Sequence, residues 1–305
     1  MTVDVIIPTY KPDATFGMLI DKLQVQDYPI RKIIVINTQE EFWRESYVQK
    51  YENIELHHIQ KAAFDHGGTR AWAASLSEAD IMVFMTQDAM PGNSRLLTNL
   101  LKPFEDPDVR LVASRQLPAE GCHEIERYTR AFNYPLSSRK KTSADLPQLG
   151  IKTYFCSNVC AAYDRKTYDA LGGFVKRTIF NEDMIYAAAV ISAGYALFYT
   201  ADAEVIHSHN YTLREQFSRN FDLGVSQAEF PEVFGNLPSE GEGIRLVKST
   251  ALHLLAIGRP WLIAYLIAQS ASKYLGYRKG KRYKSLSRSK IKKYTMNPGY
   301  WDTKQ

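Results

Sequence analysis

The sequence predicts an α/β fold, with a mainly parallel central sheet flanked by helices and a helical, basic C-terminal extension. Three observations support this prediction. Short β-branched runs alternate with helix-like segments through the first hundred residues, the pattern is irregular in the middle, and positive charge gathers at the end. Alternating strands and helices are typical of parallel sheets. With 305 residues and 45% hydrophobic content, the chain can form one large domain and a smaller appendage.

Four β-branched runs are the predicted strands of the first half: Val3–Pro8, Lys32–Asn37, Ile54–Ile59 and Ile81–Thr86. Between the first two, residues 15–26 place apolar side chains at helical spacing, as a crossover helix does. Ligands of such sheets bind beyond the carboxyl ends of the strands. We therefore expect one crevice to be lined by the residues at these ends: Pro8, Thr9, Tyr10, Asn37, Thr38, Gln87 and Asp88.

The second half is less regular. Residues 115–155 mix Pro, Gly, Ser and a basic cluster, which favours surface loops around a site. The pattern then returns, with a predicted strand at Asn158–Tyr163, a helix at Asn181–Ser192, and a strand and turn at Ala196–Ile206.

The charge is unevenly distributed. Residues 243–305 carry 14 Lys and Arg and one acidic residue, whereas residues 1–242 carry 24 and 32. A basic segment of this kind suits nucleic acid or an anionic lipid surface. Two uncharged stretches, Ser249–Gly258 and Pro260–Ser272, are each shorter than the about 20 residues that span a bilayer.

Apolar helices beside a cationic flank with interleaved tyrosines fit an interfacial anchor on lipid. We therefore expect residues 244–293 to contact an anionic membrane surface. The alternative is a helix packed on the main domain, followed by a disordered basic end. No recognisable nucleic-acid module accompanies the tail, so nucleic acid is not an expected partner.

Three cysteines occur: Cys122, Cys156 and Cys160. They form neither a CxxC pair nor an even framework. We therefore expect no disulfides and a reducing compartment.

Three acidic residues are candidates for chemistry. Asp88 follows an apolar predicted strand, where its carboxylate can hold a hard cation. Such a cation can neutralise the negative charge that develops on a diphosphate leaving group during a transfer reaction. Glu182 and Asp183 begin a predicted helix, and burial there would make one of them a suitable general base. The structural alternatives are a turn residue at Asp88 and two acids that favour the helix dipole.

Two further segments are candidates for metal or phosphate binding. His207 and His209 are two apart in an extended stretch, so both imidazoles can face one ligand, although a surface histidine pair is the alternative. The turn from Asp65 through Gly67 and Gly68 to Arg70 is expected to expose backbone N–H groups at a helix start. Arg70 adds a bidentate phosphate donor. The turn lacks the ending of a Walker loop.

Taken in order, these segments resemble a family 2 glycosyltransferase with the GT-A fold (nucleotide-diphospho-sugar transferase fold), over roughly residues 1–230. The run from His66 to Arg70, combined with Thr86-Gln87-Asp88, is similar to the rhamnosyltransferase branch of that family. The resemblance implies Mg²⁺ or Mn²⁺ as cofactor and an inverting, single-displacement mechanism.

The resemblance also implies residue roles. Asp183 is the implied catalytic base with Glu182 as its neighbour, and the implied metal ligands are Asp88 and His207, with His209 as a further candidate. The implied donor-binding residues are Pro8, Thr9, Tyr10, Asn37, Asp65, Gly67, Gly68, Arg70, Gln87 and Asp88.

The implied reaction transfers L-rhamnose from dTDP-β-L-rhamnose to a polyprenyl-linked glycan acceptor in bacterial surface polysaccharide synthesis. The enzyme is then expected at the cytoplasmic face of the cell membrane, as a peripheral protein. The expected domains are residues 1–235, which are catalytic, and residues 236–305, which associate with the membrane. Within the first, residues 1–115 would bind the nucleotide and residues 116–235 the acceptor.

Two departures from the family pattern matter. Asn37-Thr38 stands where the family usually has an acidic residue, and the usual Asp-x-Asp motif is reduced to Gln87-Asp88-Ala89. Metal binding would then depend on the donor phosphates and His207, since Mg²⁺ commonly uses few protein ligands.

Other functions remain open at this stage. They are a UDP-hexose-dependent glycosyltransferase, a sugar nucleotidyltransferase, and a catalytically inactive scaffold at the membrane. A homo-oligomer is also left open.

Overall fold

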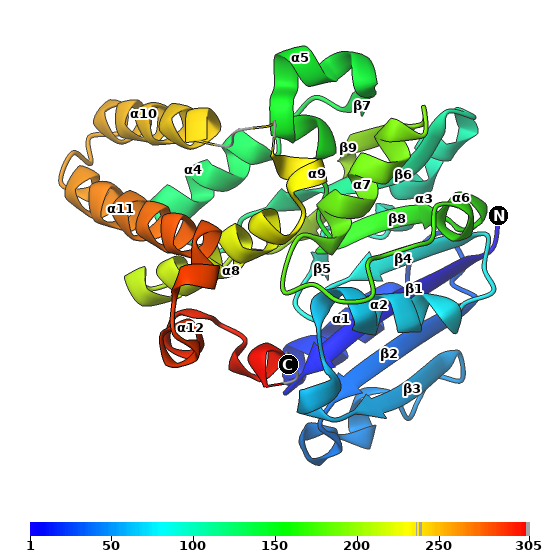
Figure 1. Cartoon of the computed structure of the whole chain (residues 1–305). Helices are drawn as coiled ribbons and strands as arrows, with labels where there is room; N and C mark the ends of the chain where they lie inside the picture. The colour runs from blue at the N-terminus through cyan, green and yellow to red at the C-terminus, as the bar shows by residue number, and fades with distance from the viewer. Residues whose placement is uncertain (236, 238–239, 303–305) are drawn as a thin grey trace. The chain divides into compact units, whose positions relative to one another are not determined.

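The computed structural model describes residues 1–235, 237 and 240–302 (Figure 1). The chain divides into two compact units. The first contains residues 1–117, 134–177 and 182–207, and the second contains residues 118–133, 178–181 and those from 208 onward. The expected extension, 236–305, begins and ends on residues outside the described part, so its boundary stays a prediction.

The first unit contains a sheet of nine strands within the described residues, in the order β3-β2-β1-β4-β8-β6-β9-β5, with β7 also paired to β9. Figure 1 shows β3, β2, β1 and β4 running side by side. The strands are β1 (Val3–Tyr10), β2 (Lys32–Thr38), β3 (Ile54–Ile59), β4 (Ile81–Met85), β5 (Met90–Pro91), β6 (Val109–Leu117), β7 (Arg139–Lys141), β8 (Cys160–Asp164) and β9 (Ala196–Ile206).

The sheet is mixed. Parallel pairing runs through β3, β2, β1 and β4, and again between β6 and β9. By contrast, β8 is antiparallel to both β4 and β6, and β5 and β7 are antiparallel to β9. The α/β class is confirmed. The expected parallel order describes the nucleotide-binding half better than the rest, because β8 enters the sheet in the opposite direction.

Helices of the first unit cover the sheet: α1 (Ala14–Gln24), α2 (His66–Ser75), α3 (Leu96–Leu101), α5 (Leu146–Leu149), α6 (Arg165–Ala170) and α7 (Glu182–Ser192). Alternate residues of β1, namely Val3, Val5 and Ile7, are fully buried in one core with Phe16 of α1 and Leu97 of α3. Side chains two apart on a strand share a face, which explains this set. Each such buried side chain contributes about 1.5–3 kcal/mol.

The described part of the second unit is helical: α4 (Glu124–Asn133), α8 (Leu213–Glu229), α9 (Pro231–Phe234), α10 (Glu240–Ala256), α11 (Leu262–Lys281) and α12 (Arg288–Tyr294). Helices α8 and α11 pack with their backbones in contact. A Cβ added at Gly280 of α11 would lie 2.1 Å from the carbonyl oxygen of Phe221 on α8, so only glycine permits this approach. No helix among the described residues combines the length and apolar character needed to cross a bilayer.

The region expected to consist of loops, residues 115–155, contains the end of β6 and the whole of α4. Helix α4 has only Ile125 and Glu126 buried, but Ile125, Tyr128 and Phe132 stand at helical spacing, so the expectation of loops here was wrong and the periodicity was present in the sequence. All three cysteines are free, as expected.

Candidate functional site

The carboxyl ends of β1 and β4 are tied together. The Gln87 side chain accepts from the Tyr10 backbone N–H (2.8 Å) and donates to the Tyr10 carbonyl (3.1 Å). Parallel pairing in register brings these ends to one edge of the sheet, as expected. Tyr10 is exposed, and its hydroxyl accepts from Lys61 Nζ at 3.1 Å.

Asn37, near the end of β2, pairs in register with Thr9 of β1. It is fully buried, and its carbonyl oxygen accepts from Thr9 Oγ1 at 3.1 Å. Its amide group contacts the Gln39 carbonyl and His58 Nδ1 at 3.1 and 3.0 Å. The Asn37 side chain is therefore used within the protein, where it positions Thr9 at the end of β1. Pro8 is partly buried in the same strand.

Asp65 begins helix α2. Its carboxylate accepts from the Gly68 backbone N–H at 2.8 Å and caps the helix. The sequence predicted a turn with free N–H groups here, followed by a helix from Ala71. The structure instead places Gly67 and Gly68 in the first turn, because the Asp65 cap starts the helix at His66.

Arg70 on α2 pairs with Glu182 on α7. Its Nη1 lies 3.1 Å from Glu182 Oε1, and the two side chains are 7% and 6% exposed. Nη1 also lies 3.2 Å from His66 Nδ1. A buried carboxylate without a cation would be costly, and the Arg70 guanidinium supplies that cation to Glu182 next to Asp183.

Asn158 holds both acids at the start of α7. Its backbone N–H donates to Asp183 Oδ2 (3.0 Å), and its side-chain amide donates to Glu182 Oε1 (3.0 Å). Its side-chain oxygen Oδ1 accepts from the Tyr163 hydroxyl (2.6 Å). Asp183 Oδ1 accepts from the Met184 N–H at 2.7 Å. The carboxylate of Asp183 is thus fixed through both of its oxygens.

The pKa of Asp183 is raised above the ordinary aspartate value. Burial is the main cause, because it penalises the charged form, and the neighbouring Glu182 carboxylate adds repulsion. Arg70 and the two backbone N–H groups act in the opposite direction. A raised pKa makes the carboxylate a stronger proton acceptor, which is the property a general base requires.

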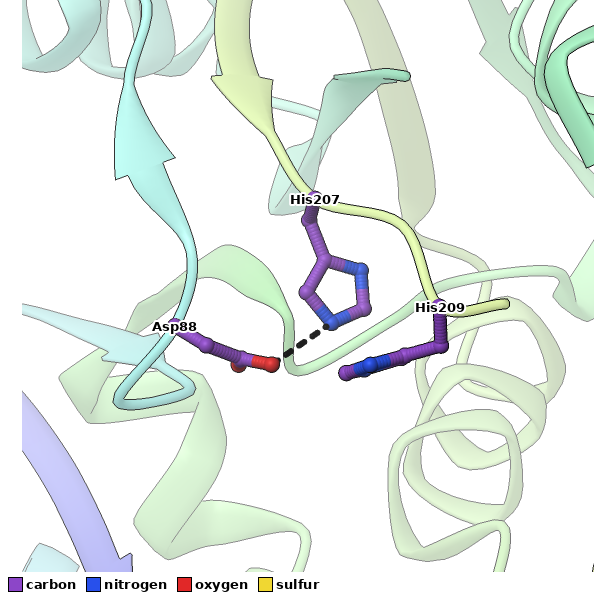
Figure 2. A group of neighbouring side chains, drawn as sticks. All are labelled: Asp88, His207 and His209. Carbon is purple, nitrogen blue, oxygen red and sulfur yellow. Dashed lines mark ion pairs between the residues drawn. The ribbon is translucent and has the colours of Figure 1, made fainter. Parts of the chain in front are cut away.

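Asp88 and His207 form a second group. Asp88 Oδ2 lies 3.5 Å from His207 Nε2, and the side chains are 37% and 8% exposed (Figure 2). His207 Nδ1 lies 3.3 Å from the Gln116 side-chain oxygen. A His207 ring that donates from Nδ1 to Gln116 directs the Nε2 lone pair toward Asp88, an arrangement suited to binding a metal ion there.

Figure 2 also draws His209, the next histidine along the same segment. Asp88, His207 and His209 each offer one atom that can bind a metal ion. His209 lies in the second unit, whereas Asp88 and His207 both lie in the first. The distance given for this group is therefore that between Asp88 and His207. Carboxylate and imidazole ligands fit a divalent cation such as Mn²⁺.

Both aspartates lie at the same end of the sheet. Asp88 follows the carboxyl end of β4, and Asn158, which binds Asp183, precedes the amino end of the antiparallel neighbour β8. The Thr86 N–H donates to the Val159 carbonyl at 3.2 Å, which links the two loops directly. If the aspartates lay at opposite ends of the sheet, they could not belong to a single catalytic centre.

Sequence reasoning missed two residues of this site, Asn158 and Gln116. Asn158 was expected only to begin a strand, and Gln116 fell among the predicted loops. Neither has a local sequence signal for this role, because the acids and the imidazole that they contact are 24 or more residues away.

Comparison with known proteins identifies the family of the chain. The sequence model of the family described as glycosyl transferase family 2 matches residues 4–172. The O-antigen chain rhamnosyltransferase RfbN of Salmonella typhimurium (strain LT2) is 40% identical over 309 residues, which covers 100% of this chain and 98% of the relative. The O-antigen chain rhamnosyltransferase WbaN of Salmonella anatum is 39% identical, covering 98% and 96%.

Solved structures show the same fold. The mannosyltransferase PcManGT from Pyrobaculum calidifontis, in complex with GDP-Man and Mn²⁺, aligns with a TM-score of 0.56 at 18% identity, covering 98% of this chain and 84% of that one. Residues 1–349 of S. aureus TarS align with a TM-score of 0.54 at 14% identity, covering 93% and 91%. The predicted GT-A fold is confirmed.

Proposed function

The chain belongs to glycosyl transferase family 2, and we propose that it transfers L-rhamnose from dTDP-β-L-rhamnose to a lipid-linked glycan during surface polysaccharide synthesis. One observation carries the proposal: the chain matches two O-antigen chain rhamnosyltransferases over almost its whole length, at 40% and 39% identity. The paired acidic groups at one end of the sheet support it, because such a transfer needs both a base and a charge sink.

In the proposed reaction, Asp183 accepts the proton of an acceptor hydroxyl. The acceptor oxygen forms a bond to C1 of the sugar while the bond from C1 to the diphosphate breaks, and dTDP leaves with the electron pair. The anomeric configuration inverts, giving an α-linked product. Asn158 holds the base in place, and the Arg70–Glu182 pair keeps a cation beside it.

Asp88 and His207 would hold a divalent cation, with His209 as a further ligand. The cation would neutralise negative charge on the diphosphate. Support comes from the chemistry of the ligands and from the Gln116 contact that orients His207. The similar PcManGT structure is a complex with GDP-Man and Mn²⁺. We propose Mg²⁺ or Mn²⁺ as the ion.

The donor would lie along the edge formed by Pro8, Thr9, Tyr10 and Gln87. Tyr10 offers an exposed aromatic ring for the nucleotide, and its backbone is held by the two contacts with Gln87. The start of α2, formed by Asp65, Gly67 and Gly68, would lie near the donor. Asn37 would hold Thr9 in place through the hydrogen bond between their side chains. Arg70 would act on the diphosphate from its buried position beside Glu182.

A donor screen tests the proposal. Purified full-length protein is incubated with dTDP-, UDP- and GDP-sugars in the presence of Mn²⁺ or Mg²⁺, and nucleotide release is measured. We expect release from dTDP-β-L-rhamnose that EDTA stops. Preference for a UDP-hexose would replace the donor assignment, and no release from any nucleotide sugar would favour the inactive scaffold.

We also propose that residues 244–293 contact an anionic membrane surface at the cytoplasmic face of the cell membrane. Large apolar side chains are exposed on α10 and between α10 and α11, with Leu252 and Trp261 each 68% exposed. The last turn of α11 is basic. Sedimentation with phosphatidylglycerol vesicles should exceed that with phosphatidylcholine vesicles and should weaken as salt rises.

A further inference from the structure

The second unit contains two cavities that share wall residues. The first has a volume of about 740 Å³, the second about 600 Å³, and Ile125 and Gln269 line both. The first is bordered by polar and aromatic side chains, including Arg127, Arg259 and Tyr265. The two cavities therefore meet at one wall and differ in polarity.

The second cavity lies among α4, α8, α10 and α11. Its apolar lining residues are Ile125, Leu223, Ile244, Leu246, Val247 and Leu266. Several of its polar lining groups are already used within the protein. The Thr129, Thr250 and Ser270 hydroxyls each donate to a carbonyl of their own helix at 2.7 Å. A ligand here would find little to hydrogen-bond, so it must be largely hydrocarbon.

The charge of the same cavity is positive. Lys248 and Lys273 line it, and no acidic residue does among those that the structure describes. Burial lowers the pKa of the Lys273 ammonium, and Glu126, the carboxylate that acts on it in the opposite direction, is paired with Arg130 at 2.6 Å. Arg130 and Arg219 add positive charge around Lys273. A hydrocarbon ligand with one anionic end would match this distribution.

The cavity also continues into an exposed apolar surface. Ile244, Tyr274 and, one residue on, Leu275 are between 50% and 57% exposed on α10 and α11. A chain reaching the cavity from a lipid layer would therefore keep apolar contact along its path.

We propose that the second cavity binds the hydrocarbon chain of a glycan acceptor linked to polyprenyl through phosphate, with Lys273 beside that phosphate. The first cavity then takes the polar saccharide end. This inference rests on the proposed function, because it assigns a place to the lipid of the proposed acceptor.

Farnesyl phosphate, a short soluble polyprenyl phosphate, provides the test. Its dissociation constant is measured by calorimetry on the full-length protein without detergent. We expect saturable binding of one molecule per chain. Val247→Trp, which fills the cavity, should weaken binding at least about tenfold. Lys273→Gln should remove the preference for farnesyl phosphate over farnesol. Leu252→Trp, on an exposed part of α10 outside the cavity lining, should leave binding unchanged.

Equal binding by Val247→Trp, or equal weakening by Leu252→Trp, would overturn the assignment. So would equally tight binding of lysophosphatidic acid, which would identify a phospholipid site. A photoreactive farnesyl phosphate crosslinked to the wild-type chain avoids any folding defect of a variant. We expect crosslinks within 244–250 or 266–277, and crosslinks confined to other segments would contradict the proposal.

The outcome is separable from the proposed function. Hydrolysis of dTDP-β-L-rhamnose without acceptor tests the enzyme alone. Hydrolysis without farnesyl phosphate binding removes only this inference, whereas absence of hydrolysis removes the proposed function.

Discussion

The two acidic groups of the first unit are held in different ways. Asp183 accepts backbone hydrogen bonds at both oxygens, and its neighbour Glu182 is buried against Arg70. Asp88 is 37% exposed and faces an imidazole at 3.5 Å. A group that must move a proton at one position gains from rigid support, whereas a group that receives an ion and its ligand must be accessible. The difference indicates a base at Asp183 and an ion site at Asp88.

The largest expected effect is on turnover. Asp183→Asn should reduce kcat by about 10²- to 10⁴-fold, because the amide cannot accept the acceptor proton, and should leave dTDP binding nearly unchanged. Transfer kinetics and calorimetry with dTDP measure the two quantities. Asp202→Asn, at an exposed position of β9, is the matched control and should behave as wild type. Equal loss of binding and turnover would argue for a structural role of Asp183.

Asp88→Asn should act on binding instead. Without the carboxylate, Mn²⁺ should no longer strengthen dTDP binding, whereas in the wild type it should. Calorimetric titrations of dTDP with and without Mn²⁺ show the difference. If Mn²⁺ strengthened binding in this variant as much as in the wild type, the ion would have to be held elsewhere.

Asn158→Ala tests whether the base depends on its support. Loss of the side chain removes one hydrogen bond from Glu182, which keeps its contact with Arg70, and one from the buried Tyr163 hydroxyl, and should cost about 1–3 kcal/mol of unfolding free energy. The backbone bond to Asp183 can persist, so the fall in kcat should be smaller than in Asp183→Asn. Urea unfolding and transfer kinetics check both. A variant as inactive as Asp183→Asn but of wild-type stability would identify a direct catalytic role for Asn158.

The pH dependence follows from the raised pKa of Asp183. The base works only when deprotonated, so kcat/KM should fall as the pH drops through this raised value, above the ordinary aspartate range. Glu182→Gln removes a negative neighbour, which lowers the pKa, and the acid limb should move to lower pH. Circular dichroism verifies that the variant folds. A shift to higher pH would contradict the assignment of the limb to Asp183.

Gln116→Leu should have the smallest effect. His207 would lose the group that orients its ring, and Mn²⁺ affinity should fall about tenfold. Manganese titration followed by electron paramagnetic resonance measures affinity without any turnover. Gln116→Glu also accepts from Nδ1, so it should retain most of the affinity, and identical losses in both variants would show that ring orientation does not matter.

The first strands could be predicted closely from the sequence. The third strand has the predicted bounds, Ile54–Ile59, because β-branched runs between polar turns define such strands locally. The start of α2 was missed by five residues, since Gly67 and Gly68 hide a helix that Asp65 caps. Helix α4 was missed although Ile125, Tyr128 and Phe132 stand at helical spacing, because the Pro, Gly and Ser residues around it favoured loops.

The site could be predicted in part. Asp88, Asp183 and His207 were recognisable because each follows or begins a regular element. Their partners were not, since Asn158 meets α7 and Gln116 meets His207 only through tertiary packing. Arg70 was expected at a diphosphate, and its pairing with Glu182 depends on two helices 112 residues apart. Long-range polar contacts of this kind leave no pattern in one sequence.

Anomalous diffraction from crystals grown with dTDP and Mn²⁺ tests the division of roles most directly. We expect one manganese peak bonded to Asp88 and His207 and in contact with the diphosphate, with Asp183 outside the coordination shell. A peak coordinated by Asp183 or Glu182 would contradict the account.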